Sequence, residues 1–176
     1  METRENARPP AVSILLPTYN RAGFLPQAFE AIRGQRFTDW ELVIIDDGSN
    51  DDTAEVVRKG TADWIQPVRY VRQENQGVAG ARNAALDLAG GDFVAFFDSD
   101  DVWLPHHLSD CVAALQANPE VDWVYGASRV VDFASGRVIN DNSFYLDGAP
   151  RPFLGLRHTV KDRLHLITDE IGRAHV

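Results

Sequence analysis

Disulfide bonds and membrane spans are both missing from this sequence. Cys111 is the one cysteine among 176 residues, which excludes an internal disulfide and predicts a reducing compartment. It lies in a partly apolar, helix-like stretch, so we expect it to fill core space rather than act as a nucleophile. No stretch approaches the ~20 apolar residues that cross a bilayer, and METRENARPP at the start lacks the apolar core of a signal peptide. The sequence predicts a soluble segment in the cytoplasm, with peripheral attachment to the inner membrane face left open.

Basic runs and the common phosphate-binding loops are absent as well. The formal net charge is −9 and no run of lysine or arginine occurs, which argues against a nucleic-acid partner. Neither G-x-x-x-x-G-K-[ST] nor G-x-G-x-x-G is present, so P-loop and dinucleotide sites lack their signature. What remains is an ordinary globular composition, 44% hydrophobic and 24% charged, which is enough for one domain with a hydrophobic core.

Short apolar runs alternate with helical periodicity through the first two thirds of the chain. Strands are predicted at 12–16, 42–45, 68–71, 93–97 and 121–125, and helices at 24–35, 51–59, 78–89 and 104–117. This alternation predicts an α/β fold with a mostly parallel central sheet flanked by helices. Beyond Tyr125 the pattern weakens to a hairpin that joins 130–131 to 137–139, a loop over 141–155 and a helix over 159–167.

Three carboxylates follow the fourth predicted strand, in FVAFFDSDDVW (93–103). Two carboxylates ~4 Å apart repel by ~4 kcal/mol at an effective dielectric of 20, so a fold protonates one of them, separates them or places a cation between them. Asp98 and Asp100 supply the hard oxygen ligands that Mg²⁺ and Mn²⁺ prefer, with water and substrate phosphate completing the shell. Ligands of open α/β sheets bind outside the carboxyl ends of the strands, which is where this motif stands.

A calcium loop, an aspartyl phosphatase site and a helix cap each fit the acidic motif poorly. A calcium loop that began at Asp98 would need Gly and Glu where Trp103 and Ser109 stand. Phosphatases with an aspartyl nucleophile carry their Asp-x-Asp after the first strand, not the fourth. A helix-capping role for the two aspartates would account for one of them at most. The sequence therefore favours a divalent cation site.

A second cluster of polar residues is predicted at the same edge of the sheet. The first strand ends in PTYNR (17–21), the second in DDGS (46–49), and a helix begins within NQGVAGARN (75–83). Tyr19 offers a flat face for a base, a carboxylate at Asp47 can accept from a ring N–H, and Arg82 brings positive charge near phosphate. Each has a structural alternative: Tyr19 at the edge of the core, Asp46 as a helix N-cap, Arg82 on the surface.

Taken in order, four stretches resemble the inverting glycosyltransferases of family 2, which have the GT-A nucleotide-diphospho-sugar transferase fold. They are VSILLPTYNR (12–21), ELVIIDDGSNDDT (41–53), NQGVAGARNAAL (75–86) and FVAFFDSDDVW (93–103). The resemblance implies a UDP-sugar or a similar nucleotide-sugar as donor. It also implies Mn²⁺ or Mg²⁺ as cofactor. It also implies a role in polysaccharide or cell-envelope glycan synthesis.

The resemblance also implies roles for individual residues. Pro17, Thr18 and Tyr19 would line the base pocket and Asp47 would bind the base. Arg82 would lie near base or phosphate, and Asp98 and Ser99 near the ribose and phosphates. Asp98 and Asp100 would hold the metal.

Family members invert the anomeric carbon in one displacement, in which a general base, commonly Asp, deprotonates an acceptor hydroxyl on a glycan, a lipid-linked sugar or another molecule. The carboxylates available as base are Asp141, Asp147, Asp162, Asp169 and Glu170, and spacing selects none of them, so the catalytic residue is unknown. For His106, His107, His158 and His165 we expect surface or helix-capping roles.

The expected organisation is an N-terminal tail (1–10), a donor-binding part (11–126), a partial acceptor-side part (127–169) and a distinct end (170–176). Its last six residues, IGRAHV, resemble the in-frame translation of a sequencing adapter, so we expect native sequence to stop near Asp169. Two other functions stay open: a nucleotide-sugar binding module without transfer activity, and a nucleotidyltransferase. The latter typically has a Gly-rich basic loop after its first strand, and PTYNR is not one.

Overall fold

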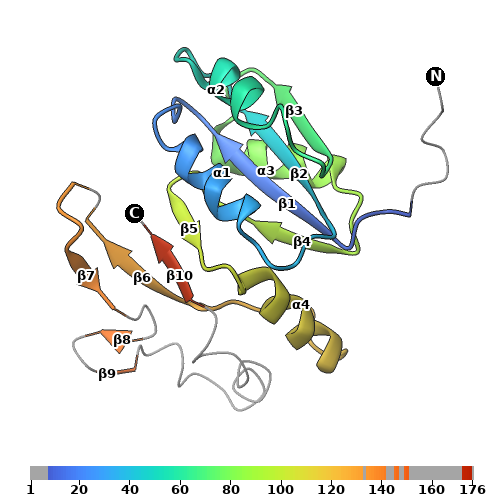
Figure 1. The fold of residues 1–176 in the computed structure, drawn as a ribbon, viewed down its shortest axis with the longest axis vertical. Coiled ribbons are helices and arrows are strands. Elements are labelled where there is room, and N and C mark those ends of the chain that lie inside the picture. Colours follow the sequence, from blue (N-terminus) through green and yellow to red (C-terminus); the bar gives the residue numbers. More distant parts are fainter. Residues whose placement is uncertain (1–7, 133, 142–144, 147–148, 151–171, 176) are drawn as a thin grey trace. The chain divides into compact units, whose positions relative to one another are not determined.

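The computed structural model describes residues 8–132, 134–141, 145–146, 149–150 and 172–175 (Figure 1). The chain divides into two compact units. Unit 1 comprises Met1–Phe29 and Thr38–Ser99, and unit 2 comprises Glu30–Phe37 and Asp100–Val176. Among the described helices, none is both long enough and apolar enough to cross a membrane.

Unit 1 is built on a four-stranded parallel sheet. Its strands are β1 (Val12–Thr18), β2 (Trp40–Asp46), β3 (Val68–Arg72) and β4 (Phe93–Phe96), in the order β3-β2-β1-β4. Every residue of β1 and β2 is buried, as expected for the apolar central strands of a sheet that is covered on both faces. The first four predicted strands and their parallel arrangement are confirmed.

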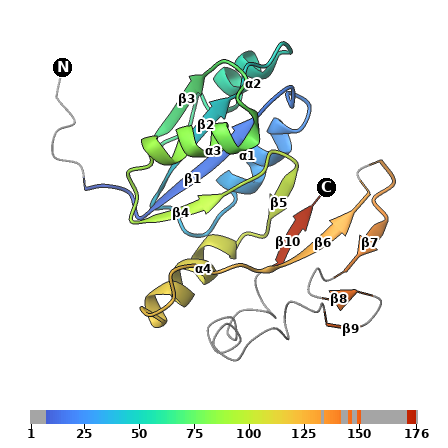
Figure 2. The same ribbon diagram turned by 180° about the vertical axis from the view of Figure 1, so that it is seen from behind.

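Helices cover both faces of this sheet (Figures 1 and 2). On one face α3 (Gly77–Leu88) packs Ala81 and Ala85 against the strands. Their partners are Leu15 of β1 and Val43 and Ile45 of β2. The small alanine side chains let the helix approach the strands closely. The other face carries α2 (Thr53–Gly60) and the first residues of α1 (Leu25–Arg33). The three predicted helices of this region are confirmed to within a few residues.

Close packing at the amino edge of the sheet makes Gly91 sensitive to substitution. A Cβ at Gly91 would lie 2.7 Å from Ser13 N and 2.8 Å from Val12 C, and neither main-chain atom can move within a buried strand. We expect Gly91→Ala to lower the free energy of unfolding by about 2 kcal/mol. Gly23→Ala is the control, because a Cβ there meets nothing within 4 Å. Urea unfolding of both variants measures the difference, and equal stabilities would contradict the expectation.

The described residues of unit 2 form a mixed sheet, the end of α1 and a further helix. The strands β5 (Asp101–Trp103), β6 (Ala127–Val131), β7 (Val138–Asn140) and β10 (Gly172–His175) lie in the order β5-β10-β6-β7. The further helix is α4 (His107–Ala117), and two short strands, β8 (Tyr145–Leu146) and β9 (Ala149–Pro150), pair with each other. β6 and β7 form the predicted hairpin, whose turn contains Gly136 at φ 67°.

Several predictions for unit 2 are wrong or stay untested. Residues 121–125 form no strand, because Asp122 and Trp123 are exposed and the sheet takes its strand from β6 instead. β5 was not predicted, since its three residues continue an acidic motif. Part of the expected loop over 141–155 forms β8 and β9, and the helix over 159–167 lies outside the described residues. β10 lies within 170–176 and pairs with β5 and β6. Strands pair through main-chain atoms, which every sequence has, so this pairing does not test whether IGRAHV is native sequence. The expectation of an adapter-derived end stays a prediction.

Candidate nucleotide site

The carboxyl edge of the unit 1 sheet gathers the residues that the motifs singled out. Thr18 lies in register with Asp46, and Asp46 with Arg72, so β1, β2 and β3 end at one level. β4 runs parallel beside β1, and Phe97 N–H continues the pairing by donating to Leu15 O. The loops after β1, β2 and β4 therefore leave the sheet at the same edge, as predicted.

Asp47 accepts hydrogen bonds from three groups at this edge. Its carboxylate is buried and accepts from Gln73 Nε2 at 2.7 Å, from Gln76 N at 2.8 Å and from Gly77 N at 2.8 Å. The last two groups are the first amides of α3, whose own Gln76 side chain makes no capping bond. Asp47 thus supplies, from the end of β2, the negative charge that suits the N-terminus of a helix.

Asp46 has a different role from the one considered for it. It does not cap α2; its buried carboxylate accepts from Ser49 N at 2.8 Å through Oδ1 and from Tyr70 OH at 2.6 Å through Oδ2. Arg72 Nε lies 3.7 Å from Oδ2. The N-cap alternative for Asp46 is wrong, because the carboxylate turns toward β3 and its own loop.

The turn after β1 is fastened to the loop after β2. Asn20 N–H donates to Ser49 Oγ at 2.9 Å, and Asn20 Oδ1 accepts from Asn50 N at 2.7 Å. Asn20 has a φ of 53°, a left-handed backbone that asparagine tolerates better than most residues. Immediately before it, Tyr19 is 45% exposed, so its ring is accessible rather than part of the core. Pro17 is buried within β1, opposite Ile45.

Arg82 and Asp98 form an ion pair at this edge. Arg82 Nη2 donates to Asp98 Oδ1 at 2.7 Å, and the guanidinium lies 5.9 Å from the centroid of the Phe96 ring. The Arg82 side chain is 38% exposed, so its surface alternative stays a prediction beside the phosphate role. Two buried polar atoms here, Arg82 Nε and Thr18 Oγ1, make no hydrogen bond within the described part of the chain. Buried polar groups are nearly always paired, so both atoms suit a ligand.

The predicted metal ligands lie on either side of the division between the units. Asp98 is partly exposed and ends unit 1 together with the buried Ser99, while Asp100 opens the second segment of unit 2. No group of three or more His, Cys, Asp or Glu side chains among the described residues could hold a metal ion. A cation bound by two carboxylates and completed by water and phosphate needs no such group, so the donor set fits Mg²⁺ or Mn²⁺.

Several polar residues of this edge were not predicted. Tyr70 contacts Asp46 at the end of β2, and Arg72 and Gln73 contact the loop that follows β2; all three precede the predicted segment 75–83 and lie in none of the four motif stretches. Of the candidate bases, Asp141 is exposed and accepts from Arg129 Nε at 2.7 Å. Asp147, Asp162, Asp169 and Glu170 lie outside the described residues.

Two residues of α4 belong to the packing of unit 2. Burial raises the pKa of the Cys111 thiol to about 12, which keeps it protonated and agrees with a core-filling role. The expected surface or capping role of His107 is wrong, because its ring is buried and stacks on Trp103. His106 precedes α4 without making a side-chain capping bond, and His158 and His165 lie outside the described residues.

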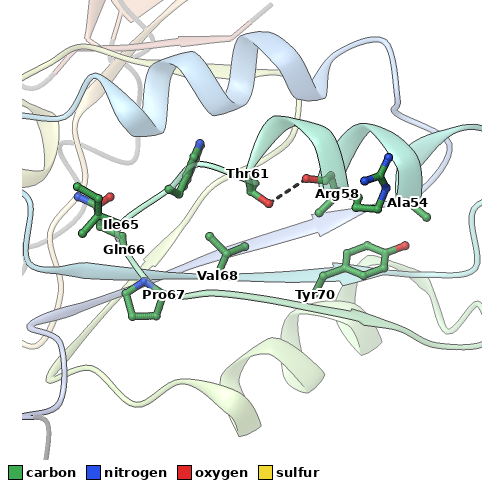
Figure 3. Close-up of a pocket in the computed structure, with 10 residues that line it drawn as sticks. Ala54, Arg58, Thr61, Ile65, Gln66, Pro67, Val68 and Tyr70 are labelled. Carbon is green, nitrogen blue, oxygen red and sulfur yellow. Dashed lines mark hydrogen bonds between the residues drawn. The ribbon is translucent and has the colours of Figure 1, made fainter. Parts of the chain in front are cut away.

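A pocket of about 480 Å³ lies between α2 and β3 (Figure 3). It is lined by Arg58 and Thr61 of the helix side, the exposed Ile65, and Val68 and Tyr70 of the strand. None of the predicted site residues lines it. The candidate nucleotide site is therefore the carboxyl edge of the sheet and not this pocket.

The chain has the fold of the GT-A type transferases. The family model described as "Glycosyl transferase family 2" matches residues 13–169, so the chain belongs to that family. A chondroitin synthase of Escherichia coli is 31% identical over 140 residues, which is 80% of this chain and 20% of that protein. The UDP-Glc:alpha-D-GlcNAc-diphosphoundecaprenol beta-1,3-glucosyltransferase WfgD of Escherichia coli is 32% identical over 69% of this chain and 47% of its own length. The chain thus spans less than half the length of these relatives.

Solved structures agree with this assignment. TarS of S. aureus in complex with UDP is 27% identical with a TM-score of 0.60, covering 77% of this chain and 39% of that one. A mannosyltransferase from Pyrobaculum calidifontis in complex with GDP-Man and Mn²⁺ is 31% identical with a TM-score of 0.60, covering 71% of this chain and 36% of that one. The predicted GT-A fold is confirmed.

Proposed function

We propose that this chain is the donor-binding part of a metal-dependent, inverting glycosyltransferase that transfers a sugar from a UDP-sugar to an acceptor hydroxyl. The observation that carries the proposal is the convergence of Thr18, Asp47, Arg82 and Asp98 at one edge of a parallel sheet. Two buried donors there, Thr18 Oγ1 and Arg82 Nε, make no hydrogen bond within the described residues and suit a polar ligand.

The base would lie between Tyr19 and Asp47. The exposed Tyr19 ring offers a stacking face, and a carboxylate has about four acceptor positions, of which Asp47 uses three. The remaining position suits the ring N–H of uracil. Thr18 and Pro17 would complete the wall of the base pocket, and Ser99 would face the ribose.

The diphosphate would be held by charge. Asp98 and Asp100 would hold Mn²⁺ or Mg²⁺, which as a Lewis acid stabilises the negative charge of the departing diphosphate. Arg82, fixed by Asp98 at 2.7 Å, would add a second positive charge. A cation at this position also accounts for a chain whose net charge is −9 yet whose ligand is anionic.

The comparisons support the class of donor and suggest the class of acceptor. TarS is described in complex with UDP and with UDP-GlcNAc, and the Pyrobaculum mannosyltransferase with GDP-Man and Mn²⁺. WfgD is named for a UDP-Glc donor and a diphosphoundecaprenol-linked acceptor. We accordingly propose a glycan or lipid-linked acceptor, a role in polysaccharide or cell-envelope glycan synthesis, and a cytoplasmic protein peripheral to the inner membrane face.

A nucleotide-sugar binding module without transfer activity is the second candidate. It is favoured by Asp141, whose carboxylate is paired with Arg129 and exposed, and so is poorly placed to act as a general base. UDP release from a UDP-sugar with Mn²⁺, with and without added acceptor sugars, distinguishes the two. Release supports the transferase, whereas UDP binding without release supports the module.

Asp100→Ala is expected to remove the metal dependence of UDP binding and to leave the fold intact. Asp100 is partly exposed, so the loss of its carboxylate should cost little stability, while the cation loses one of its two protein ligands. Calorimetry should show that Mn²⁺ strengthens UDP binding about tenfold in the unmodified chain and not in the variant. Asp122→Ala, which removes another exposed carboxylate of unit 2, is the control. Equal Mn²⁺ effects in both variants would contradict the assignment.

A further inference from the structure

We propose that Tyr70 and Arg72 are positioning residues for the nucleotide, which act through Asp46 to fix the loop that carries Asp47. The proposal rests on the proposed nucleotide site and assigns it two residues from β3 that no motif includes. Neither side chain needs to touch the ligand. Their effect would pass through main-chain geometry at the ends of β1 and β2.

Asp46 is the centre of this arrangement. Its carboxylate, 1% exposed, joins Tyr70 OH at 2.6 Å, Ser49 N at 2.8 Å and Arg72 Nε at 3.7 Å. Arg72 Nη2 also donates to Ser49 O at 2.8 Å, so β3 holds both the side chain and the main chain of the loop. Burial and the hydrogen bond to Asp46 raise the pKa of Tyr70, so its hydroxyl stays protonated and donates.

The loop has a backbone that needs such support. Gly48 has a φ of 87°, and a Cβ there would lie 3.2 Å from Asn75 N, so the loop turns sharply against the segment that leads to α3. From this loop Ser49 Oγ accepts from Asn20 N, which holds Asn20 at a φ of 53° directly after Tyr19. One chain of contacts thus runs from Tyr70 and Arg72 to both residues proposed to hold the base.

Arg69 provides a matched control on the same strand. It is 49% exposed, donates to Leu88 O at 2.8 Å and lies 3.8 Å from Glu41 Oε2. Arg72 is 56% exposed and makes the same two kinds of contact at 2.8 Å and 3.7 Å. The two arginines differ in where they attach, since Arg69 holds the end of α3 and Arg72 the loop after β2. Their substitution should cost similar stability.

The test compares Arg72→Gln, Tyr70→Phe and Arg69→Gln by UDP titration in Mn²⁺ and by thermal unfolding. We expect Arg72→Gln and Tyr70→Phe each to raise the Kd for UDP about tenfold, and Arg69→Gln to change it less than twofold. Arg72→Lys should restore part of the affinity. If the two glutamine variants weaken UDP binding equally, the effect is general destabilisation and the proposal is wrong.

Uridine separates positioning from direct contact with phosphate. If Arg72 acts through the loop, Arg72→Gln weakens uridine and UDP by the same factor. If only UDP binding suffers, Arg72 binds the diphosphate directly and the positioning role is overturned. A chain that binds neither UDP nor uridine before substitution would refute the proposed function instead, so the two failures are distinguishable.

Discussion

Asp47→Ala is expected to lower the free energy of unfolding of unit 1 by about 3 kcal/mol and to abolish measurable UDP binding. The stability loss follows because the first amides of α3, at Gln76 and Gly77, lose their acceptor and the helix N-terminus loses its compensating charge. The binding loss follows from the proposed contact between Asp47 and the base. Since whole domains are stable by only about 5–15 kcal/mol, the first effect is large.

Asp51→Ala is the matched control for this substitution. Asp51 also accepts three hydrogen bonds, from Ala22 N at 3.0 Å, Thr53 N at 3.1 Å and Thr53 Oγ1 at 2.6 Å, but it is exposed. Its loss should cost about 1 kcal/mol, as for other exposed hydrogen-bonding side chains, and leave UDP binding within a few-fold. Urea unfolding and calorimetry measure the two quantities. If Asp47→Ala binds UDP normally once folded, its contact with the base is wrong and only its capping role stands.

The central sheet and the edge that carries the site were predictable from the sequence. Short, β-branched apolar runs such as 42–45 are typical of buried strands, and parallel strands place their carboxyl ends together. Thr18, Asp47 and Asp98 each directly follow or end such a run, so strand positions alone bring them to one edge. The local sequence pattern was sufficient to predict this edge, because the position of each residue follows from the strand that it ends or follows.

The partners of these side chains were not predictable in the same way. Which donors surround Asp46 depends on β3 lying at the edge beside β2, and on Tyr70 and Arg72 facing back toward that carboxylate. The sequence places 68–71 in a strand without fixing its neighbour. The same limit explains Val121–Tyr125, whose alternation suits a strand but whose exposed Trp123 is left outside the sheet.

Helix capping and the proposed ligand binding involve the same residues of the candidate site. Asp47 holds the N-terminus of α3, and Arg82 from the same helix holds Asp98, so the helix links the side proposed for the base to the side proposed for the phosphates. A substitution at either acid therefore alters the fold and the proposed ligand contacts together. For this reason each site variant needs a control with matched hydrogen bonds elsewhere in the chain.

His107 is a buried titratable residue of unit 2. Its ring stacks on Trp103 with centroids 4.6 Å apart, and its Nε2 lies 3.8 Å from Cys111 Sγ. Burial lowers the pKa of His107 to about 4. Asp110 has a smaller effect that raises this pKa, and His106 has a smaller effect that lowers it further. The buried ring is therefore neutral at pH 7, and folding opposes its protonation.

We expect the free energy of unfolding to fall by about 2.5 kcal/mol between pH 7.5 and pH 4.5 because of His107 alone. At pH 7.5 and above, the ring is almost entirely neutral in both states and contributes almost no pH dependence. As the pH falls from 6.5 toward 4, the unfolded chain binds a proton that the folded chain does not, so stability is lost in that window.

His107→Phe keeps a ring beside Trp103 but cannot titrate, so the difference between its urea unfolding curves and those of the unmodified chain isolates the imidazole. His106→Gln, at a partly exposed ring, should change this difference only slightly, because the effect of His106 on the pKa of His107 is smaller than that of burial. Identical pH profiles for His107→Phe and the unmodified chain would show that the His107 ring accepts its proton as readily folded as unfolded.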